Sequence, residues 1–281
     1  MKDLPSQADD AGIAALLAER YGAGQAYDVI DNALIRHLLR HRSVRAFQPG
    51  KALPGNLPET LVAAAQSAST SSNLQVWSVV AVQDKAHKDR LARLANDQDF
   101  VRQAPLFLVW LADLSRVRRV AARQGQEVNG TDFLEALVLG SVDAALAAQN
   151  AALAAESLGL GVVYVGAIRS HVTEVAQDLK LPPYVFPVFG MAVGHPAETA
   201  AAHIRPRLPQ AAVLHREHYD AAPEPQAAEV YDQALDAFWK KQSIQHPLWT
   251  RHIVNRLGAV DPDNGRYQLS RILRELGFPL R

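Results

Sequence analysis

The stretch of this chain that first indicates its fold is HRSVRAF, residues 41–47, which places an imidazole, a hydroxyl and two guanidinium groups close together. A second compact basic element, RPRLP, follows far along the chain at residues 205–209. Its proline stiffens the backbone between two arginines, and the planar arginine fork suits the oxygens of a phosphate. Two separated basic elements of this kind predict that they hold one phosphorylated ligand between them.

Composition limits the classes of function. The 281 residues include 29 Lys and Arg and 29 Asp and Glu, so the formal net charge is zero. A general nucleic-acid binder or a protein of anionic membranes needs an excess of positive charge, and we expect neither. The chain has no cysteine, which excludes disulfides, thiolate nucleophiles and cysteine-bound zinc or iron–sulfur centres. Any redox chemistry must therefore come from a bound cofactor.

The first residues, MKDLPS, carry charges and a proline where a secretory signal needs an apolar run, so we expect a cytoplasmic protein. No window is apolar over the length needed to cross a bilayer. The most apolar stretches, Val76–Val82 and Leu106–Ala112, have the length of strands. They predict a buried sheet rather than a membrane segment.

Hydrophobic periodicity predicts alternating helices and strands. Strands are expected at residues 76–82, 106–112, 162–168 and 188–193. Helices are expected at residues 11–21, just before His41, from Glu59 onward, and at 86–96, 131–158, 171–179 with Ser170 as the cap, 229–241 and 267–276. The segment 131–158, broken at most once near Gly140, is expected to be a central core helix because its apolar residues nearly encircle it.

Several motifs leave a functional and a plain structural interpretation open. The hydroxyl cluster at residues 69–73 could line a polar ligand or simply close a helix. The run HRSVR, taken alone, is more often a solvated helix end than a site. Gly159-Leu160-Gly161 precedes a strand, whereas a dinucleotide fingerprint follows one, so we reject a Rossmann site. The histidines lack metal-ligand spacing, and we expect no metal.

Taken in order, the motifs resemble the nitroreductase family of FMN-dependent oxidoreductases, and within it the nitroreductase A and flavin reductase P group. The similarity covers roughly residue 30 to the C-terminus. It depends on HRSVRAF, AQSASTSSNLQ, VRQAPLFLVWLAD, AESLGLGVVYVGAIR, VFGMAVGHP, RPRLP, AEVYDQALDAFW and LWTRHI. The combination of these motifs in one order is more specific than any of them alone.

The resemblance implies an α+β fold in which helices flank a mixed, mainly antiparallel sheet, and an intertwined homodimer with FMN at the subunit interface. It divides the chain into an N-terminal arm (1–26), an FMN-binding core (27–210) and a C-terminal extension that embraces the partner (211–281). The arm has no counterpart in the family pattern.

The resemblance also implies which residues bind the cofactor. The basic elements are expected to meet the phosphate, ribityl chain and pyrimidine edge, and the hydroxyl turn to border the flavin from the neighbouring subunit. A strand-end backbone is expected to contact the ring, with a glutamine near it. These residues are His41, Arg42, Ser43, Arg45, Ser69, Thr70, Ser71, Gln103, Tyr164, Val165, Gly166, Arg205 and Arg207. No side chain is expected to act as acid, base or nucleophile, although Arg45 is the candidate to tune the flavin.

The implied reaction is two-electron, ping-pong transfer from NADPH or NADH through FMN to a nitroaromatic, quinone or similar small acceptor. Two alternatives remain: a flavin reductase that supplies free reduced flavin, and a flavin-binding sensor without turnover. The donor is open because Gln242, preceded by Lys240 and Lys241, stands where the group has an arginine for the NADPH 2′-phosphate. The unusual stretch 258–265 leaves the acceptor pocket open as well.

Overall fold

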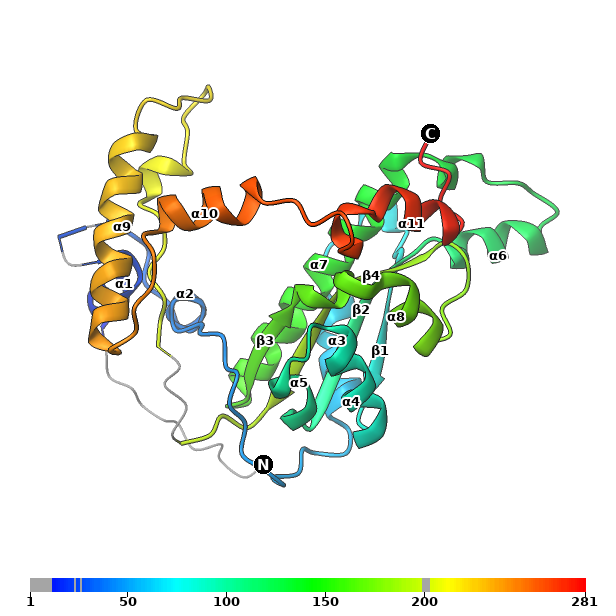
Figure 1. The fold of residues 1–281 in the computed structure, drawn as a ribbon, viewed down its shortest axis with the longest axis horizontal. Coiled ribbons are helices and arrows are strands. Elements are labelled where there is room, and N and C mark those ends of the chain that lie inside the picture. Colours follow the sequence, from blue (N-terminus) through cyan, green and yellow to red (C-terminus); the bar gives the residue numbers. More distant parts are fainter. Residues whose placement is uncertain (1–11, 23, 26, 199–202) are drawn as a thin grey trace. The chain divides into compact units, whose positions relative to one another are not determined.

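The computed structural model describes residues 12–22, 24–25, 27–198 and 203–281. The chain divides into two compact units, each built from two stretches of sequence (Figure 1). One unit comprises Met1–Arg42 and His203–Val260, and the other comprises Ser43–Ala202 and Asp261–Arg281. These units cut across the three segments expected from the sequence, because each joins an early stretch to a late one.

The first unit is helical. It contains α1 (Ile13–Tyr21), α2 (Ala33–Leu39), the short 3-10 helix η4 (Gln210–Ala212), α9 (Glu224–Lys241) and α10 (Trp249–Gly258). The helix expected at residues 11–21 is α1, although residue 11 lies outside the described residues. Helix α9 begins five residues earlier than the expected 229–241 because Pro225 suits a first helical turn.

The second unit is built on a four-stranded sheet in the order β1-β2-β4-β3. The strands are β1 (Trp77–Val82), β2 (Leu106–Asp113), β3 (Gly161–Val165) and β4 (Val185–Gly194). All three neighbouring pairs are antiparallel, which confirms the mainly antiparallel sheet. Among the described residues, parallel pairing is confined to one isolated bridge, between Ser43 and Val162. The expected strand at 162–168 ends at Val165 because a 3-10 turn begins at Gly166.

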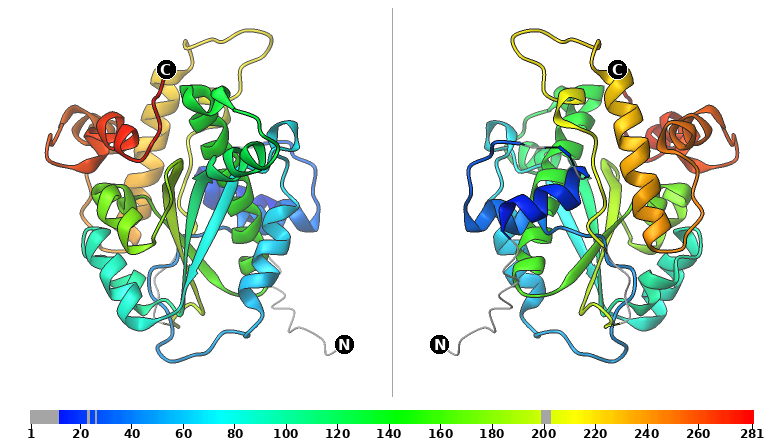
Figure 2. Two further views of the ribbon diagram at one scale, coloured as in Figure 1. Left: turned by 90° about the vertical axis from the view of Figure 1, so that its right-hand side faces the viewer. Right: turned by 90° about the vertical axis from the view of Figure 1, so that its left-hand side faces the viewer.

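Helices cover both faces of the sheet (Figure 2). One face carries α3 (Leu57–Gln66) and α7 (Leu134–Ser157); the other carries α4 (Lys85–Leu94), α5 (Asp99–Gln103), the 3-10 helix η3 (Gly166–His171) and α8 (Val172–Asp178). The remaining elements are η1 (Ser71–Asn73), α6 (Ser115–Arg123), η2 (Asn129–Asp132), η5 (Gly265–Tyr267) and α11 (Leu269–Glu275). His171, not Ser170, precedes α8 as its N-cap residue, so the expected Ser170 cap was wrong.

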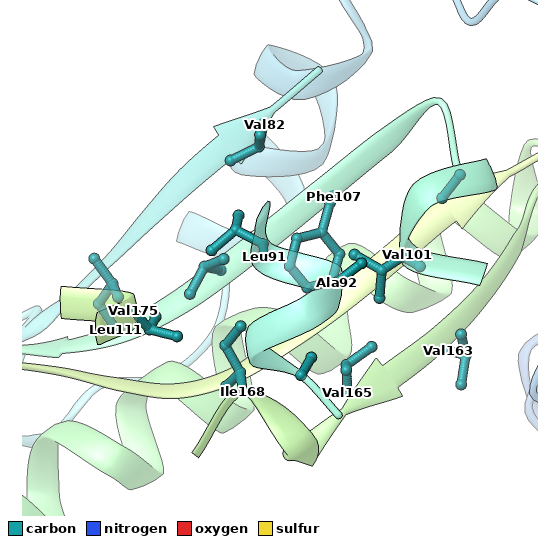
Figure 3. Close-up of a cluster of buried hydrophobic side chains, with 14 of the residues drawn as sticks. Val82, Leu91, Ala92, Val101, Phe107, Leu111, Val163, Val165, Ile168 and Val175 are labelled. Atoms are coloured by element: carbon teal, nitrogen blue, oxygen red, sulfur yellow. The ribbon is translucent and has the colours of Figure 1, made fainter. Parts of the chain in front are cut away.

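The central strand β2 shows why the chain folds into layers. Successive side chains of a strand point to opposite faces, and every residue of β2 is buried. Phe107 and Val109 enter the cluster formed with α4, α5 and α8 (Figure 3), whereas Leu108 and Trp110 enter the cluster formed with α3 and α7. The continuous apolar run at 106–112 is thus a strand buried on both sides.

Helix α7 is continuous through Gly140, where an added Cβ would lie 3.1 Å from Ala112 Cβ. It is not encircled by the core, however. One face buries alanines against the sheet, and the opposite face exposes an apolar stripe at Leu134, Val138, Val142 and Leu146. Among the described helices, α7 is long and apolar enough to span a membrane, so the expectation that no window reaches this length was wrong. A core helix of a globular protein meets the same criteria of length and composition.

Candidate functional site

The two basic elements meet in the first unit through Arg20, a residue that the sequence analysis did not select. Its guanidinium donates to the backbone carbonyl of Arg205 at 2.9 Å, and to those of Leu39 and His41 at 2.6 and 2.8 Å. Its own carbonyl accepts the Arg207 N–H at 2.7 Å. The side chain is 6% exposed. Arg20 therefore joins the backbone of the 41–47 element to that of the 205–209 element.

The charged side chains of these elements face outward from this buried link. Arg42, Arg205 and Arg207 are exposed, and His41 is half-buried. The Arg205 guanidinium lies over the Trp239 ring at 5.0 Å from its centroid, a cation–π contact. Exposed guanidiniums on neighbouring backbone segments form a surface suited to an anion.

Tyr231 supports the second basic element from α9. It is buried, and its hydroxyl donates to the Pro206 carbonyl at 3.3 Å. Burial raises the pKa of the Tyr231 phenol, while the nearby Arg207 and Arg205 act in the opposite direction. The phenol therefore stays protonated and available as a donor.

In the second unit, Ser43 lies at the outer edge of β3. Val44 N donates to the Val162 carbonyl at 2.9 Å, which forms the parallel bridge. This close approach requires glycine at position 161, because an added Cβ there would lie 2.6 Å from Val44 Cβ. Ser43 and Arg45 are exposed on either side of the buried Val44. The alternation presents their side chains to solvent.

The strand end expected to contact a ring system is Tyr164-Val165-Gly166. Tyr164 is half-buried and packs edge-to-face on Phe189 at 5.2 Å, while Val165 is buried in the opposite cluster. Burial raises the pKa of Tyr164, so it remains a neutral phenol. Both side chains are occupied by packing, and what this segment offers to a ligand is backbone.

Two arginines that the sequence analysis missed converge on Gly166. A Cβ added there would lie 3.5 Å from Arg169 Nη2 and 3.7 Å from Arg266 Nη2, which is ordinary contact. Arg169 donates to the Val188 carbonyl, and burial together with Arg266 lowers the Arg169 pKa. The chain's own packing thus tolerates a side chain at Gly166. Arg169 is the last residue of the AESLGLGVVYVGAIR motif, whereas Arg266 is distant in sequence and no local pattern indicated it.

Gln103 is exposed at the end of α5. A Cβ at Gly194 would meet Pro105 Cδ at 2.7 Å and Phe47 Cδ1 at 2.8 Å. Because Pro105 follows Gln103 closely, α5 ends near the chain that leaves the 41–47 element. No described hydrogen bond joins Gln103 to another candidate residue.

The hydroxyl turn is held by Asp143 of α7, another residue that the sequence analysis missed. Asp143 is 2% exposed and accepts from Thr70 Oγ1 at 2.5 Å, Ser71 N at 3.3 Å and Val76 N at 3.2 Å. The Thr70 hydroxyl is therefore directed inward. Ser69 and Ser71 are exposed.

The structure does not bring this turn to Ser43 within one chain. The turn joins the start of β1, whereas Ser43 lies beside β3, with β2 and β4 between these edge strands. The register places Trp77 opposite Ala112 at one end of β2, and Val193, the partner of Val162, opposite Leu106 at the other end. At ordinary strand dimensions this separates them by about 14 Å across the sheet and about 20 Å along it.

As a set, the candidate residues are cations, neutral donors and backbone, with no carboxylate among them. Such groups bind and orient an anion but do not form a nucleophile–base pair. None of these groups is redox-active, so electron transfer that involves them requires a bound cofactor.

Comparison with known proteins identifies the family. The sequence profile of the Nitroreductase family matches residues 38–195, and that of the Nitroreductase family, C-terminal domain matches residues 205–281. This chain belongs to the nitroreductase family. Both profiles begin after residue 37, so the nitroreductase pattern does not include α1 and Arg20.

Individual nitroreductase relatives match over most of their length. The chain is 35% identical over 252 residues to FMN reductase (NADPH) of Bacillus subtilis, covering 88% of this chain and 98% of the relative. A structure of B. megaterium NfrA2 has a TM-score of 0.83 at 36% identity, covering 89% of this chain and all of the other. NADPH:FMN oxidoreductase from Vibrio harveyi, complexed with NAD+, has a TM-score of 0.79 at 32% identity, with the same coverage.

Proposed function

We propose that this chain is an FMN-dependent NAD(P)H oxidoreductase that reduces nitroaromatics, quinones or similar small acceptors by two-electron, ping-pong transfer. The observation that carries the proposal is the convergence of the two basic elements on Arg20, which presents Arg205 and Arg207 beside the 41–42 backbone. The names of the relatives, FMN reductase (NADPH) and NADPH:FMN oxidoreductase, support the same cofactor.

The candidate residues suit FMN in charge. His41, Arg42, Arg205 and Arg207 supply donors for a doubly charged phosphate. The packing of this chain would accept a Cβ at Gly166, so it does not explain the glycine. A flat ring lying against the backbone would explain it, because a side chain would block that approach. We assign the phosphate to the basic elements and the ring to Tyr164, Val165, Gly166 and Gln103.

When bound, FMN supplies hydride acceptance at N5, and the chain's residues bind, orient and tune it. Arg45 is our candidate for the cation near the N1–C2=O edge, where a positive charge stabilises a developing anion. Arg169 and Arg266 add positive charge beside Gly166.

The same proposal includes a cytoplasmic homodimer. Ser69, Thr70 and Ser71 lie at the other edge of the sheet from Ser43, so they would border the flavin of a second copy rather than their own. The exposed apolar stripe of α7 supports this arrangement because a surface of this kind favours a partner. We expect the C-terminal extension to complete the contact.

A second function, supply of free reduced flavin to another enzyme, is favoured by the relatives' description as FMN reductases. Anaerobic reduction followed by steady-state kinetics tests both functions. Purified protein should be yellow, and NADPH should bleach it within seconds; flavin that stays oxidised would favour the sensor alternative. Comparing a nitrofuran with free FMN as acceptor then separates the two enzymes, and comparing NADPH with NADH identifies the donor.

A further inference from the structure

We propose that Arg20 is a positioning residue for the phosphate of FMN, acting through the backbone of both basic elements rather than by touching the ligand. This inference rests on the proposed function, because it assumes that the two elements bind that phosphate. It assigns a role to the N-terminal helix α1, which precedes the region matched by the nitroreductase profiles.

The first argument is connectivity. Arg20 makes two hydrogen bonds toward residues 39–41 and two toward residues 205–207. The partners of Arg20 in these four hydrogen bonds are all backbone atoms. Arg20 therefore fixes main-chain positions whatever the neighbouring side chains are. Arg205 and Arg207 have exposed side chains, whose reach is therefore determined by where their backbone is held.

The second argument is the chemistry of the side chain. Arg20 faces the carbonyl ends of α2, where the aligned peptide dipoles concentrate negative charge and a cation is stabilising. Its two Nη atoms donate to three carbonyls in all, which uses several of the fixed donors of a guanidinium. An ammonium group has fewer donors on a flexible stem, so lysine would not reproduce this link.

The third argument is that α1 is anchored independently of the link. Leu16 and Leu17 are buried on the same helix, 4% and 7% exposed. Further along, Tyr27 packs on Tyr21 and accepts the Gln210 N–H at 3.1 Å, just beyond the second basic element. Arg20 and Tyr27 thus contact the region of the second element at two places, and of these two residues only Arg20 contacts both basic elements.

The test compares FMN with riboflavin, which has the same ring and ribityl chain but no phosphate. Dissociation constants for both would be measured by flavin fluorescence in the full-length protein, its Arg20→Met variant and its Arg20→Lys variant. We expect the FMN constant to rise about tenfold or more and the riboflavin constant to change less than about twofold, because only FMN has phosphate contacts to lose. If Arg20→Met does not fold, Arg20→Lys carries the comparison.

Asp232→Asn is the matched control. Asp232 is buried in the same unit and accepts from Thr250 N at 3.1 Å and Thr250 Oγ1 at 2.6 Å, so its loss lowers Tm without touching the basic elements. An unchanged FMN-to-riboflavin ratio in both Arg20 variants, or a loss of both ligands that follows Tm as in Asp232→Asn, overturns the inference. Wild-type protein that binds FMN no better than riboflavin overturns the proposed function itself.

Discussion

The carboxylate of Asp143 accepts the Thr70 hydroxyl at 2.5 Å, and Thr70 Oγ1 in turn accepts the Gln75 N–H at 2.9 Å. In the turn from Thr70 to Gln75, the backbone φ angles of Ser72, Asn73 and Gln75 are 48°, 55° and 52°. Residues other than glycine rarely adopt this left-handed region. Such strain persists only where surrounding contacts impose it. The pair therefore determines the conformation in which the turn displays Ser69 and Ser71.

Replacing Asp143 by asparagine should destabilise the protein by about 1–3 kcal/mol, because the amide cannot accept from the Thr70 hydroxyl and both backbone N–H groups together. Urea unfolding measures this. Thr70→Ser, which keeps the hydroxyl, should unfold close to wild type, whereas Thr70→Val should lose stability, and its effect should not add to that of Asp143→Asn. Additive losses would show that the two residues act separately.

Arg207→Ala should weaken FMN binding by about 1.5–3 kcal/mol, the range for a charge-assisted contact to phosphate. Isothermal titration of the apoprotein with FMN measures the change. Arg216→Ala removes another exposed arginine from the same unit and should leave the affinity unaltered. Full affinity in Arg207→Ala would remove this residue from the phosphate site.

Val142→Asp should convert a dimer into monomers and reduce FMN binding with it. Val142 is 51% exposed in the α7 stripe, and a carboxylate there cannot be buried against a second copy without a large desolvation cost. Light scattering after size exclusion gives the mass. Val120→Asp, at a side chain 49% exposed on α6, is the control and should remain dimeric. A wild-type monomer with full FMN content would contradict the proposed shared site.

Two glycine substitutions should separate packing from ligand contact. Gly161→Ala should lower Tm, because its Cβ would lie 2.6 Å from Val44 Cβ. Gly166→Ala should leave Tm of the apoprotein nearly unchanged, since its Cβ meets side-chain atoms only at 3.5 Å and beyond, yet it should weaken FMN binding if the ring lies against this backbone. Thermal scans of apoprotein and a flavin titration measure the two effects, and tight FMN binding by Gly166→Ala would exclude that approach.

Asp113 should make the free energy of unfolding fall at acid pH. Burial alone would raise its pKa, but hydrogen bonds from the Ser115 and Ser78 hydroxyls and the nearby Arg116 outweigh burial and lower the pKa below 3.8. A depressed carboxyl pKa contributes stability above the unfolded value, and this is lost as pH falls through the folded value. The difference in unfolding free energy between wild type and Asp113→Asn should therefore be constant near neutral pH and shrink below pH 3.8. A difference that grows with acidity would reverse the assignment.

Local hydrophobic patterns predicted most helices and strands, because these elements form between residues that are close in the chain. The apolar run at 106–112 predicted β2, and the alanine-rich segment at 131–158 predicted α7. The exposed stripe of α7 could not be foreseen, since valine and leucine in a helix look alike whether they face a core, a partner or water. The role of Arg20 could not be predicted either, because no sequence pattern distinguishes a single arginine in a weakly amphipathic helix.

By itself, the sequence determined the family, the alternation of helices and strands, and the two basic elements. Each of these depends on patterns within contiguous residues, which the sequence shows directly. Only the tertiary structure decided which distant groups meet: Arg20 with the backbone of His41 and Arg205, Asp143 with Thr70, and Arg169 with Arg266 over Gly166. Those pairings depend on the packing of helices and strands far apart in sequence. A residue's type specifies what it can bind, but its partner is set by the fold.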